Sequence, residues 1–312
     1  MKTRRQAVRP RSVQAAKKRQ ERRRLPSWTY ALGGAALIAA IAGGAFLLGK
    51  DKAQKASEGP AASTGLPNTP DYHSLLVAPG DATHVLLGTH AGLYESRDGG
   101  RTWKKAALPG QDAMNLAHSD GQTVWTAGHN VLAKSTDGGA TWSDVRPEGL
   151  ASLDLHGFAV DPSKPMRLYA AVAGEGLYRS DDGGQSFDPV SREVGGAVFA
   201  LAVTRDGRIF AGDQQQGLLA SGDGGKSWTP VARAGILGLA INPADPKTIA
   251  AGGPGVLLST DGGRHWRQVL QVREGAGPVA WSQSDPEIGY AVGFDGVFYR
   301  TTDRGRTWRA VS

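Results

Sequence analysis

The sequence predicts an all-β fold: a six-bladed β-propeller built of four-stranded blades, preceded by one N-terminal transmembrane α-helix. Three observations lead to this prediction. The pattern Ser/Thr-x-Asp-x-Gly-x-Thr/Ser-Trp/Phe occurs six times, with His265 as the one exception at its seventh position. Its aspartates follow one another at intervals of 39, 45, 41, 38 and 42 residues, and a period of about forty is the length of one four-stranded blade. Upstream of the repeats, residues 30–49 contain no charged side chain.

Each copy of the pattern is expected to form a tight turn before the outer strand of a blade. Its Asp can accept hydrogen bonds from backbone N–H groups a few residues later, and its glycines can adopt positive φ angles. The terminal aromatic ring is expected to be buried between neighbouring blades. Because a catalytic group would not be copied into every blade, these residues are predicted to be structural. They are Asp98, Asp137, Asp182, Asp223, Asp261 and Asp303, with Trp103, Trp142, Phe187, Trp228, Trp266 and Trp308.

Six such boxes in register resemble the Asp-box, or bacterial neuraminidase repeat, of sialidase-type β-propellers. The resemblance covers roughly residues 72–312. Asp-box propellers include glycosidases, sorting receptors and photosystem II assembly factors, so the resemblance implies a fold and leaves function to be argued from a site. In layout the chain is most similar to the photosystem II assembly-factor-like propellers, which are single discs outside the cytoplasm with an arginine-lined surface. It departs from them in having six clear boxes without a seventh blade, and a helical anchor with a long basic tail.

The positive charge of the chain belongs to its N-terminal tail. The chain holds 36 Lys and Arg against 29 Asp and Glu, a formal net charge of +7. Residues 1–26 contain 11 of the basic residues and one acid, which leaves 25 basic and 28 acidic residues in the remainder. The high pI therefore describes the tail alone, and no nucleic-acid partner is expected.

Residues 30–49 are predicted to anchor the chain in a membrane. Twenty apolar residues at helical rise span about 30 Å, the thickness of the hydrocarbon core. The basic tail, residues 1–29, is expected in the cytoplasm by the positive-inside rule. Residues 50–71 are then a flexible linker, and the propeller, residues 72–312, is periplasmic or extracellular at the plasma (inner) membrane. A cleaved signal peptide is the alternative, but the apolar stretch is long and no clear small-x-small cleavage site precedes Asp51.

The remaining chain, about 240 residues, divides into six units of about forty. Each unit contains an inner strand, such as residues 75–78 or 239–242, and a small-residue strand, such as residues 168–172 or 248–252. A third strand, a box and an outer strand follow. The first unit begins with its inner strand and the last ends with its outer strand, so no spare strand joins the two. With no cysteine in the chain, closure of the ring must depend on packing.

The face opposite the boxes is where a site is expected. Its turns differ from blade to blade, as a binding site requires, whereas the uniform boxes indicate a scaffold. The turns between second and third strands carry His90 and His129 as candidate binding residues. Glu175, Asp213 and Asp295 in equivalent turns are the only candidate catalytic carboxylates. Ordinary hydrophilic turn residues are the alternative for each of them.

Four arginines follow the outer strands of four consecutive blades on this same predicted face: Arg146, Arg192, Arg233 and Arg273. A guanidinium is suited to bidentate capture of carboxylates or phosphates. Because Glu148, Glu193 and Glu274 stand close by, some of these arginines could instead form surface ion pairs of little energetic value.

Two functional classes remain open from the sequence, and a binding module is favoured over an enzyme. A sialidase needs an arginine triad, a Tyr nucleophile with a Glu partner, and an acidic proton donor. The Arg-Ile-Pro motif that is typical of the first blade of sialidases is absent from this sequence. No Tyr occurs in the proposed turns of the candidate face. The histidines are scattered along the sequence without ligand spacing, so no metal or cofactor is expected. The favoured partner is the acidic surface of a membrane or extracytoplasmic protein; a sialidase-like glycoside hydrolase or glycan-binding propeller is the alternative.

The anchor prediction can be tested in cells. Protease added to spheroplasts should remove the propeller and leave a small N-terminal fragment in the membrane, because residues 30–49 are long enough to span it. A soluble product lacking residues 1–50 in untreated cells would identify the segment as a cleaved signal instead.

Overall fold

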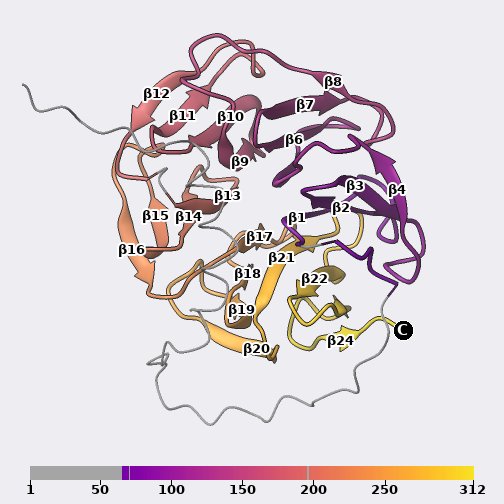
Figure 1. Cartoon of the computed structure of the whole chain (residues 1–312). Coiled ribbons are helices and arrows are strands. Elements are labelled where there is room, and N and C mark those ends of the chain that lie inside the picture. Colours follow the sequence, from indigo (N-terminus) through magenta and orange to yellow (C-terminus); the bar gives the residue numbers. More distant parts are fainter. Residues whose placement is uncertain (1–64, 70, 195–196) are drawn as a thin grey trace, which may run out of the picture. The chain divides into compact units, whose positions relative to one another are not determined.

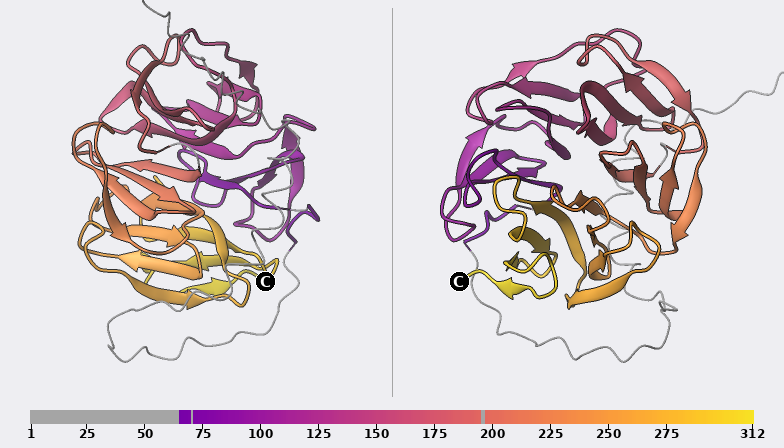
Figure 2. Two further views of the ribbon diagram at one scale, coloured as in Figure 1. Left: turned by 60° about the vertical axis from the view of Figure 1, so that its left-hand side comes forward. Right: turned by 180° about the vertical axis from the view of Figure 1, so that it is seen from behind.

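The computed structural model describes residues 65–69, 71–194 and 197–312. Over these residues the prediction of an all-β six-bladed propeller of four-stranded blades is confirmed. Six four-stranded antiparallel sheets surround a central axis, each in chain order, as both faces of the ring show (Figures 1 and 2). No membrane-crossing helix occurs among the described residues. The predicted anchor, residues 30–49, lies outside them.

The innermost strands are β1 (Ser74–Val77), β5 (Asn115–His118), β9 (Leu155–Asp161), β13 (Val198–Val203), β17 (Gly238–Ile241) and β21 (Ala276–Trp281). The second strands are β2 (Val85–Thr89), β6 (Val124–Gly128), β10 (Lys164–Val172), β14 (Ile209–Asp213), β18 (Ile249–Gly252) and β22 (Gly289–Gly293). The third strands are β3 (Gly92–Ser96), β7 (Val131–Ser135), β11 (Gly176–Ser180), β15 (Gly217–Ser221), β19 (Gly255–Ser259) and β23 (Phe298–Thr301). The outer strands are β4 (Lys104–Ala107), β8 (Ser143–Asp144), β12 (Asp188–Ser191), β16 (Thr229–Ala232), β20 (Arg267–Gln271) and β24 (Arg309–Ala310).

The hydrophobic core lies between the blades. Second and third strands bury nearly every side chain because both faces of each sheet pack against a neighbouring sheet, whereas the outer strands are mostly exposed. The buried residues form six clusters, one at each junction of neighbouring blades. A cavity of about 200 Å³ remains among the inner strands, lined by Leu75, Phe158 and Trp281 among others.

All six boxes form the same hydrogen-bonded turn, as predicted. In the second blade, buried Ser135 Oγ donates to Asp137 Oδ1 at 2.7 Å and accepts the N–H of Gly139 at 2.8 Å. Asp137 Oδ1 also accepts the N–H of Thr141, and its Oδ2 accepts the Thr141 hydroxyl. In the fifth box, the Nδ1 of His265 takes the place of this hydroxyl, 2.6 Å from Asp261 Oδ2. The exception in the sequence pattern therefore keeps the turn intact.

The second glycine of each box also packs against a large side chain. A Cβ added at Gly100 would lie 2.1 Å from the Phe298 ring, and one at Gly139 would lie 2.7 Å from Leu86. In both cases the contact belongs to the preceding blade. Both glycines have φ of +95°, which L-residues with a side chain resist. The box therefore fixes its own turn and also fits that turn against the preceding blade.

The expected burial of the box aromatics is only partly correct. Phe187 and Trp308 are buried, at 2% and 7% exposure. The other four rings are half-buried, and each indole folds back so that Nε1 donates to the second box glycine, as Trp142 does to Gly139 O at 2.9 Å. Trp308 makes the same bond to Gly305 O at 3.1 Å although its ring is buried, so this bond holds each indole against its own turn at either depth.

Side-chain packing closes the ring without a shared strand. The junction of the sixth and first blades is one cluster that includes Leu87, Tyr290 and Phe298. Trp103 packs edge-on against Phe298, with ring centroids 5.2 Å apart, and the Tyr290 hydroxyl donates to Ala82 O at 2.9 Å. β1 also contacts β21 along the central channel. The expectation that closure depends on packing is confirmed.

Acid should destabilise the propeller through its boxes. Hydrogen bonds from Thr141 and Ser135 lower the pKa of Asp137 from 3.8 to about 2, and Asp98 is lowered to about 2 in the same way. A carboxylate with a lowered folded-state pKa stabilises the fold above its unfolded pKa and loses this contribution as pH falls through the folded pKa. The melting temperature should therefore fall between pH 3.8 and about 2. Asp137→Asn should melt lower at neutral pH and show a shallower acid decline. Asp120→Asn, at an exposed turn outside the boxes, should match the wild type.

The two kinds of box aromatic should differ in importance. Phe187→Ala should lower the free energy of unfolding by about 3–5 kcal/mol, because it leaves a cavity in a buried cluster. Trp142→Ala should cost clearly less, because that ring is half-buried and a surface-facing cavity fills with water. Urea unfolding of both variants measures the difference, and an equal loss would contradict the burial pattern.

Candidate functional site

The candidate site lies on the face opposite the boxes. The boxes hydrogen-bond to the turns between first and second strands, as Gly138 N does to Gln122 O. The other face consists of the turns between second and third strands and the connections that enter the next blade. These two sets bond to each other, for example through Asn130 N to Leu153 O at 2.9 Å. Turns of adjacent blades are thus held side by side on this face.

The four predicted binding arginines all lie on the connections after β8, β12, β16 and β20 and are all exposed. Arg146 lies 3.6 Å from Asp144, Arg192 lies 3.6 Å from Glu175, and Arg273 lies 3.2 Å from Glu274. Arg233 forms no ion pair within the described part of the chain. Of the three expected glutamate partners only Glu274 pairs with its arginine. The ion pairs that do form are exposed, so they restrain the guanidinium groups weakly.

The three candidate catalytic carboxylates are each used within their own surroundings. Asp213, buried at 3% exposure, accepts the N–H groups of Gln215 and Gln216. Asp295 accepts the N–H of Val297 and the hydroxyl of Tyr299. Burial, with the charge of Asp295 adding to it, raises the pKa of Tyr299 to about 12. Glu175 faces Arg192. These contacts are those of turn-stabilising groups and leave no obvious proton donor and nucleophile pair.

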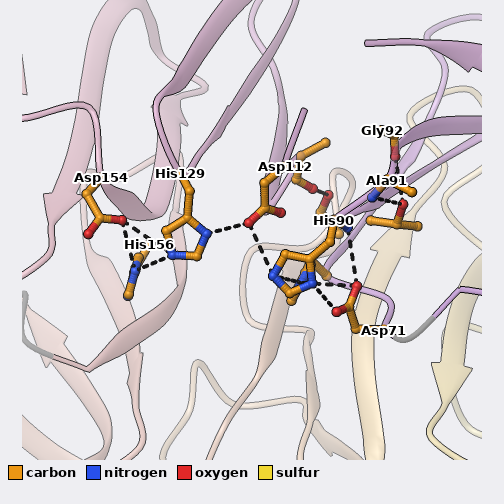
Figure 3. Close-up of polar contacts among 12 residues, drawn as sticks. Asp71, His90, Ala91, Gly92, Asp112, His129, Asp154 and His156 are labelled. Carbon is orange, nitrogen blue, oxygen red and sulfur yellow. Dashed lines mark hydrogen bonds and ion pairs between the residues drawn. The ribbon is translucent and has the colours of Figure 1, made fainter. Parts of the chain in front are cut away.

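The structure brings together a second group of residues that spans the first three blades. We call it the histidine–aspartate chain: Asp71, His73, His90, Asp112, His129, Asp154 and His156 (Figure 3). Its three aspartates precede the inner strands β1, β5 and β9, and His90 and His129 occupy the turns after β2 and β6. Carboxylates and imidazoles alternate along it, so that each aspartate contacts at least one histidine.

Asp112 joins the two halves of this chain. Its Oδ2 is in hydrogen-bond contact with Nδ1 of His129 and lies 3.3 Å from Nε2 of His90. At one end, Asp71 contacts Nδ1 of His90, and Nε2 of His73 lies 3.0 Å from that nitrogen. At the other end, His129 Nε2 lies 3.1 Å from His156 Nε2 and 3.4 Å from Asp154 Oδ1. The aspartates therefore link the histidines of adjacent blades.

The electrostatics of the chain favour the charged carboxylates of Asp71 and Asp154. Burial opposes ionisation of Asp71, but hydrogen bonds from His73 and His90 prevail and hold its pKa well below the ordinary range. The hydrogen bond to Asp71 raises the pKa of His90 against the effect of burial. The hydrogen bond to Asp112 likewise raises the pKa of His129. The interaction with His156 lowers the pKa of Asp154.

Three atoms of the chain are shielded from solvent without a hydrogen-bond partner: Asp112 Oδ1, Asp154 Oδ1 and His156 Nδ1. Few buried polar atoms in folded proteins lack a partner. Only five such side-chain atoms occur in the described residues, so three of them in one cluster mark it as unusual. The rings of His90 and His129 remain half-exposed, at 45% and 42% of their side-chain surface, so the cluster is open to solvent.

The expectation that the histidines are scattered does not hold in three dimensions. His90 and His129 were identified from their turns, and the structure joins them through Asp112, which the sequence analysis did not single out. Asp71, His73, Asp154 and His156 were missed as well. A signal was present, because the tripeptide Asp-x-His occurs just before or at the start of β1 and again at β9. The tripeptide recurs at the same position of two different blades. Motifs of metal-ligand spacing are defined within one short segment, so they do not include such a repeat.

Comparison with known proteins agrees with this fold. Residues 75–212 match the model of the photosynthesis system II assembly factor YCF48 family. No curated protein sequence matches the chain significantly. The structure of YCF48 bound to a D1 peptide is 19% identical with a TM-score of 0.51, covering 79% of this chain and 83% of that one.

Two glycoside hydrolases of family GH74 are also similar in structure. The xyloglucanase from Xanthomonas campestris is 18% identical with a TM-score of 0.56, covering 77% of this chain and 45% of that one. The enzyme from Niastella koreensis is 16% identical with a TM-score of 0.52, covering 76% and 46%. The chain thus spans less than half the length of these enzymes, and at such identities the likeness shows the fold alone. Together with the six boxes, these similarities show a propeller fold of the Asp-box, or bacterial neuraminidase repeat, type, in which residues 75–212 are similar to the YCF48 assembly-factor family.

Proposed function

We propose that the propeller is a protein-binding module that is anchored at the plasma membrane, lies outside the cytoplasm and docks an acidic segment of a membrane or extracytoplasmic partner. The observation that carries the proposal is the placement of the four arginines. Each occupies the same connection of four consecutive blades, on the face opposite the boxes, and each is exposed. A row of guanidinium groups on a rigid surface suits carboxylate capture without requiring any catalytic group.

The surroundings of the arginines support this role. Three of them have only exposed, single carboxylate contacts at 3.2–3.6 Å, and such pairs are worth little against solvent. An incoming acidic segment can replace these contacts at small cost. The remainder of the chain after residue 26 is slightly acidic, so positive charge concentrated on one face would orient an acidic partner toward it.

The comparisons support protein binding as well. The similar YCF48 structure is bound to a D1 peptide, which supports the proposal that this propeller also binds a polypeptide. Glycoside hydrolysis is the second candidate, because GH74 enzymes share the fold. The geometry favours it less. Asp213 is buried with its Oδ1 accepting two backbone N–H groups, and Glu175 faces a guanidinium.

The proposal is tested with a quadruple variant in which Arg146, Arg192, Arg233 and Arg273 are all changed to Gln. Binding of fluorescent acidic peptides and capture of membrane proteins by the purified chain are measured at rising salt. Four exposed pairs at about 0.5 kcal/mol each sum to about 2 kcal/mol, so Kd should weaken roughly thirtyfold. Wild-type binding should also weaken with added salt, since exposed charges are screened over about 8 Å at physiological ionic strength.

The matched control changes four exposed basic residues of the box face to Gln: Arg101, Lys226, Arg264 and Arg306. It alters net charge by the same amount on the opposite face and should bind like the wild type. An equal loss of affinity in both variants would mean that binding depends on net charge and not on the position of the arginines. Hydrolysis of glycosides by the wild type that is lost on substitution of Glu175, Asp213 or Asp295 would favour the enzyme instead.

A further inference from the structure

We propose that His129, Asp154 and His156 form a binding site for a divalent first-row transition-metal ion, of which Zn²⁺ is the representative. The site goes beyond the proposed protein-binding role and lies at one end of the histidine–aspartate chain (Figure 3). Its ligand atoms are Nε2 of His129, Oδ1 of Asp154 and Nε2 of His156. Two imidazoles and one carboxylate are a ligand set used for zinc and for other divalent transition metals.

The distances among the three atoms match those around one ion. The two Nε2 atoms are 3.1 Å apart, and Asp154 Oδ1 lies 3.2 Å from His156 Nε2 and 3.4 Å from His129 Nε2. Tetrahedral coordination with metal–ligand bonds of about 2.0–2.1 Å places neighbouring ligand atoms about 3.3 Å apart. The three atoms thus form a nearly equilateral triangle of the size of one face of that tetrahedron.

Hydrogen bonding sets the tautomer of His129. Its Nδ1 contacts the carboxylate of Asp112, and a carboxylate accepts a proton from the ring nitrogen that faces it. In the neutral ring this leaves a lone pair on Nε2, directed at the other two ligand atoms. Histidine ligands commonly donate their second N–H to a carboxylate in this way, which orients the ring and raises its basicity.

The unpartnered Asp154 Oδ1 supplies independent support. Asp154 Oδ1 is shielded from solvent yet meets no donor in hydrogen-bonding geometry, although two imidazole nitrogens lie within 3.4 Å. The His156 side chain beside it is only 17% exposed. The two Nε2 atoms lie 3.1 Å apart, a distance at which one ring can donate a hydrogen bond to the other. The shielded carboxylate oxygen beside them, which accepts no hydrogen bond, is explained if all three atoms direct lone pairs at a cation.

The backbone holds the ligands in place without the ion. His129 pairs with Asp154 in an antiparallel β-bridge, and Asp154 O accepts the N–H of Ala173 at 2.9 Å. Asn130, which follows His129 in the turn, has φ of +59° and donates to Leu153 O. His156 lies within β9. Two ligands therefore come from one blade and one from the preceding blade, so that a bound ion would join the two blades.

The other two groups of the chain fit an ion less well. In the group of Asp71, His73 and His90, the Asp71 carboxylate lies directly against Nδ1 of His90. The two atoms are closer to each other than two ligand atoms bound to the same ion would be. In the group of His90, Asp112 and His129, Asp112 likewise lies against Nδ1 of His129. Both are hydrogen-bonded pairs. The side chains of His129 and Asp154 are 42% and 43% exposed, which leaves room for a water or another ligand in the fourth position of the ion.

The test uses the full-length chain, purified in detergent without an affinity tag and treated with EDTA. Zn²⁺ binding is measured by calorimetry, and Co²⁺ binding by its visible absorption, which reports tetrahedral coordination. The wild type should bind Zn²⁺ at one high-affinity site and melt at a higher temperature with the ion, because ligands stabilise the state that binds them. His156→Gln should abolish this site. Asp112→Asn, which keeps all three ligands, should weaken affinity by about 10–100-fold.

His118→Gln is the matched control, since His118 lies at the end of β5 and bonds to Gly121 O, away from the proposed ligands. It should bind Zn²⁺ like the wild type. If His156→Gln does not fold, His129→Gln in the half-exposed turn replaces it. Binding that is equal in wild type, His156→Gln and His129→Gln, or no binding by the wild type at all, would overturn the site. So would an unchanged melting temperature in Zn²⁺.

Discussion

The fit of each box against the blade before it is the contact on which the ring depends. The second box glycine takes a positive φ and sits where a Cβ would overlap a neighbouring side chain, Phe298 at Gly100 and Leu86 at Gly139. A turn that hydrogen-bonds internally is rigid, so it can serve as a fixed surface for the sheet of the preceding blade. Repeated around the ring, this contact and the buried cluster beside it give six similar junctions.

Closure follows from the same packing and needs no exchanged strand. The first and last blades meet through a cluster of the same kind as the other five, supplemented by the Tyr290 hydroxyl on Ala82 O. Each blade keeps all four of its strands in chain order. A ring closed only by side chains is sensitive to loss of volume at any one junction, which makes large buried rings such as Phe298 important beyond their own blade.

The box face, which is uniform, and the opposite face, which varies from blade to blade, differ in function. The boxes spend their carboxylates on turn hydrogen bonds, and the same geometry recurs in all six blades. The opposite face carries arginines on four blades and the histidine–aspartate chain on three. Because its turns are held by bonds between adjacent blades, side chains on this face have fixed positions and can form binding sites at low entropic cost.

The sequence alone determined the blade count, the strand order and the role of the boxes, because these depend on local repeats. Hydrogen bonds within the box join residues at most four apart, as from Ser135 to Gly139, so the pattern itself encodes them. It also placed the arginines, His90 and His129 on one face, since strand alternation decides the direction of each turn.

Only the tertiary structure decided which turns meet. Asp112 contacts His90 of the blade before it, and His129 contacts His156 of the blade after it. These neighbours are separated by more than twenty residues in sequence and by a blade junction in space, so their distance depends on blade twist and packing. The depth of the box indoles was likewise decided by packing, because Trp308 is buried and Trp142 half-buried although both donate through Nε1 to a glycine of their own box. Repeats determine local turns, whereas a site assembled across blades is determined by how the sheets pack.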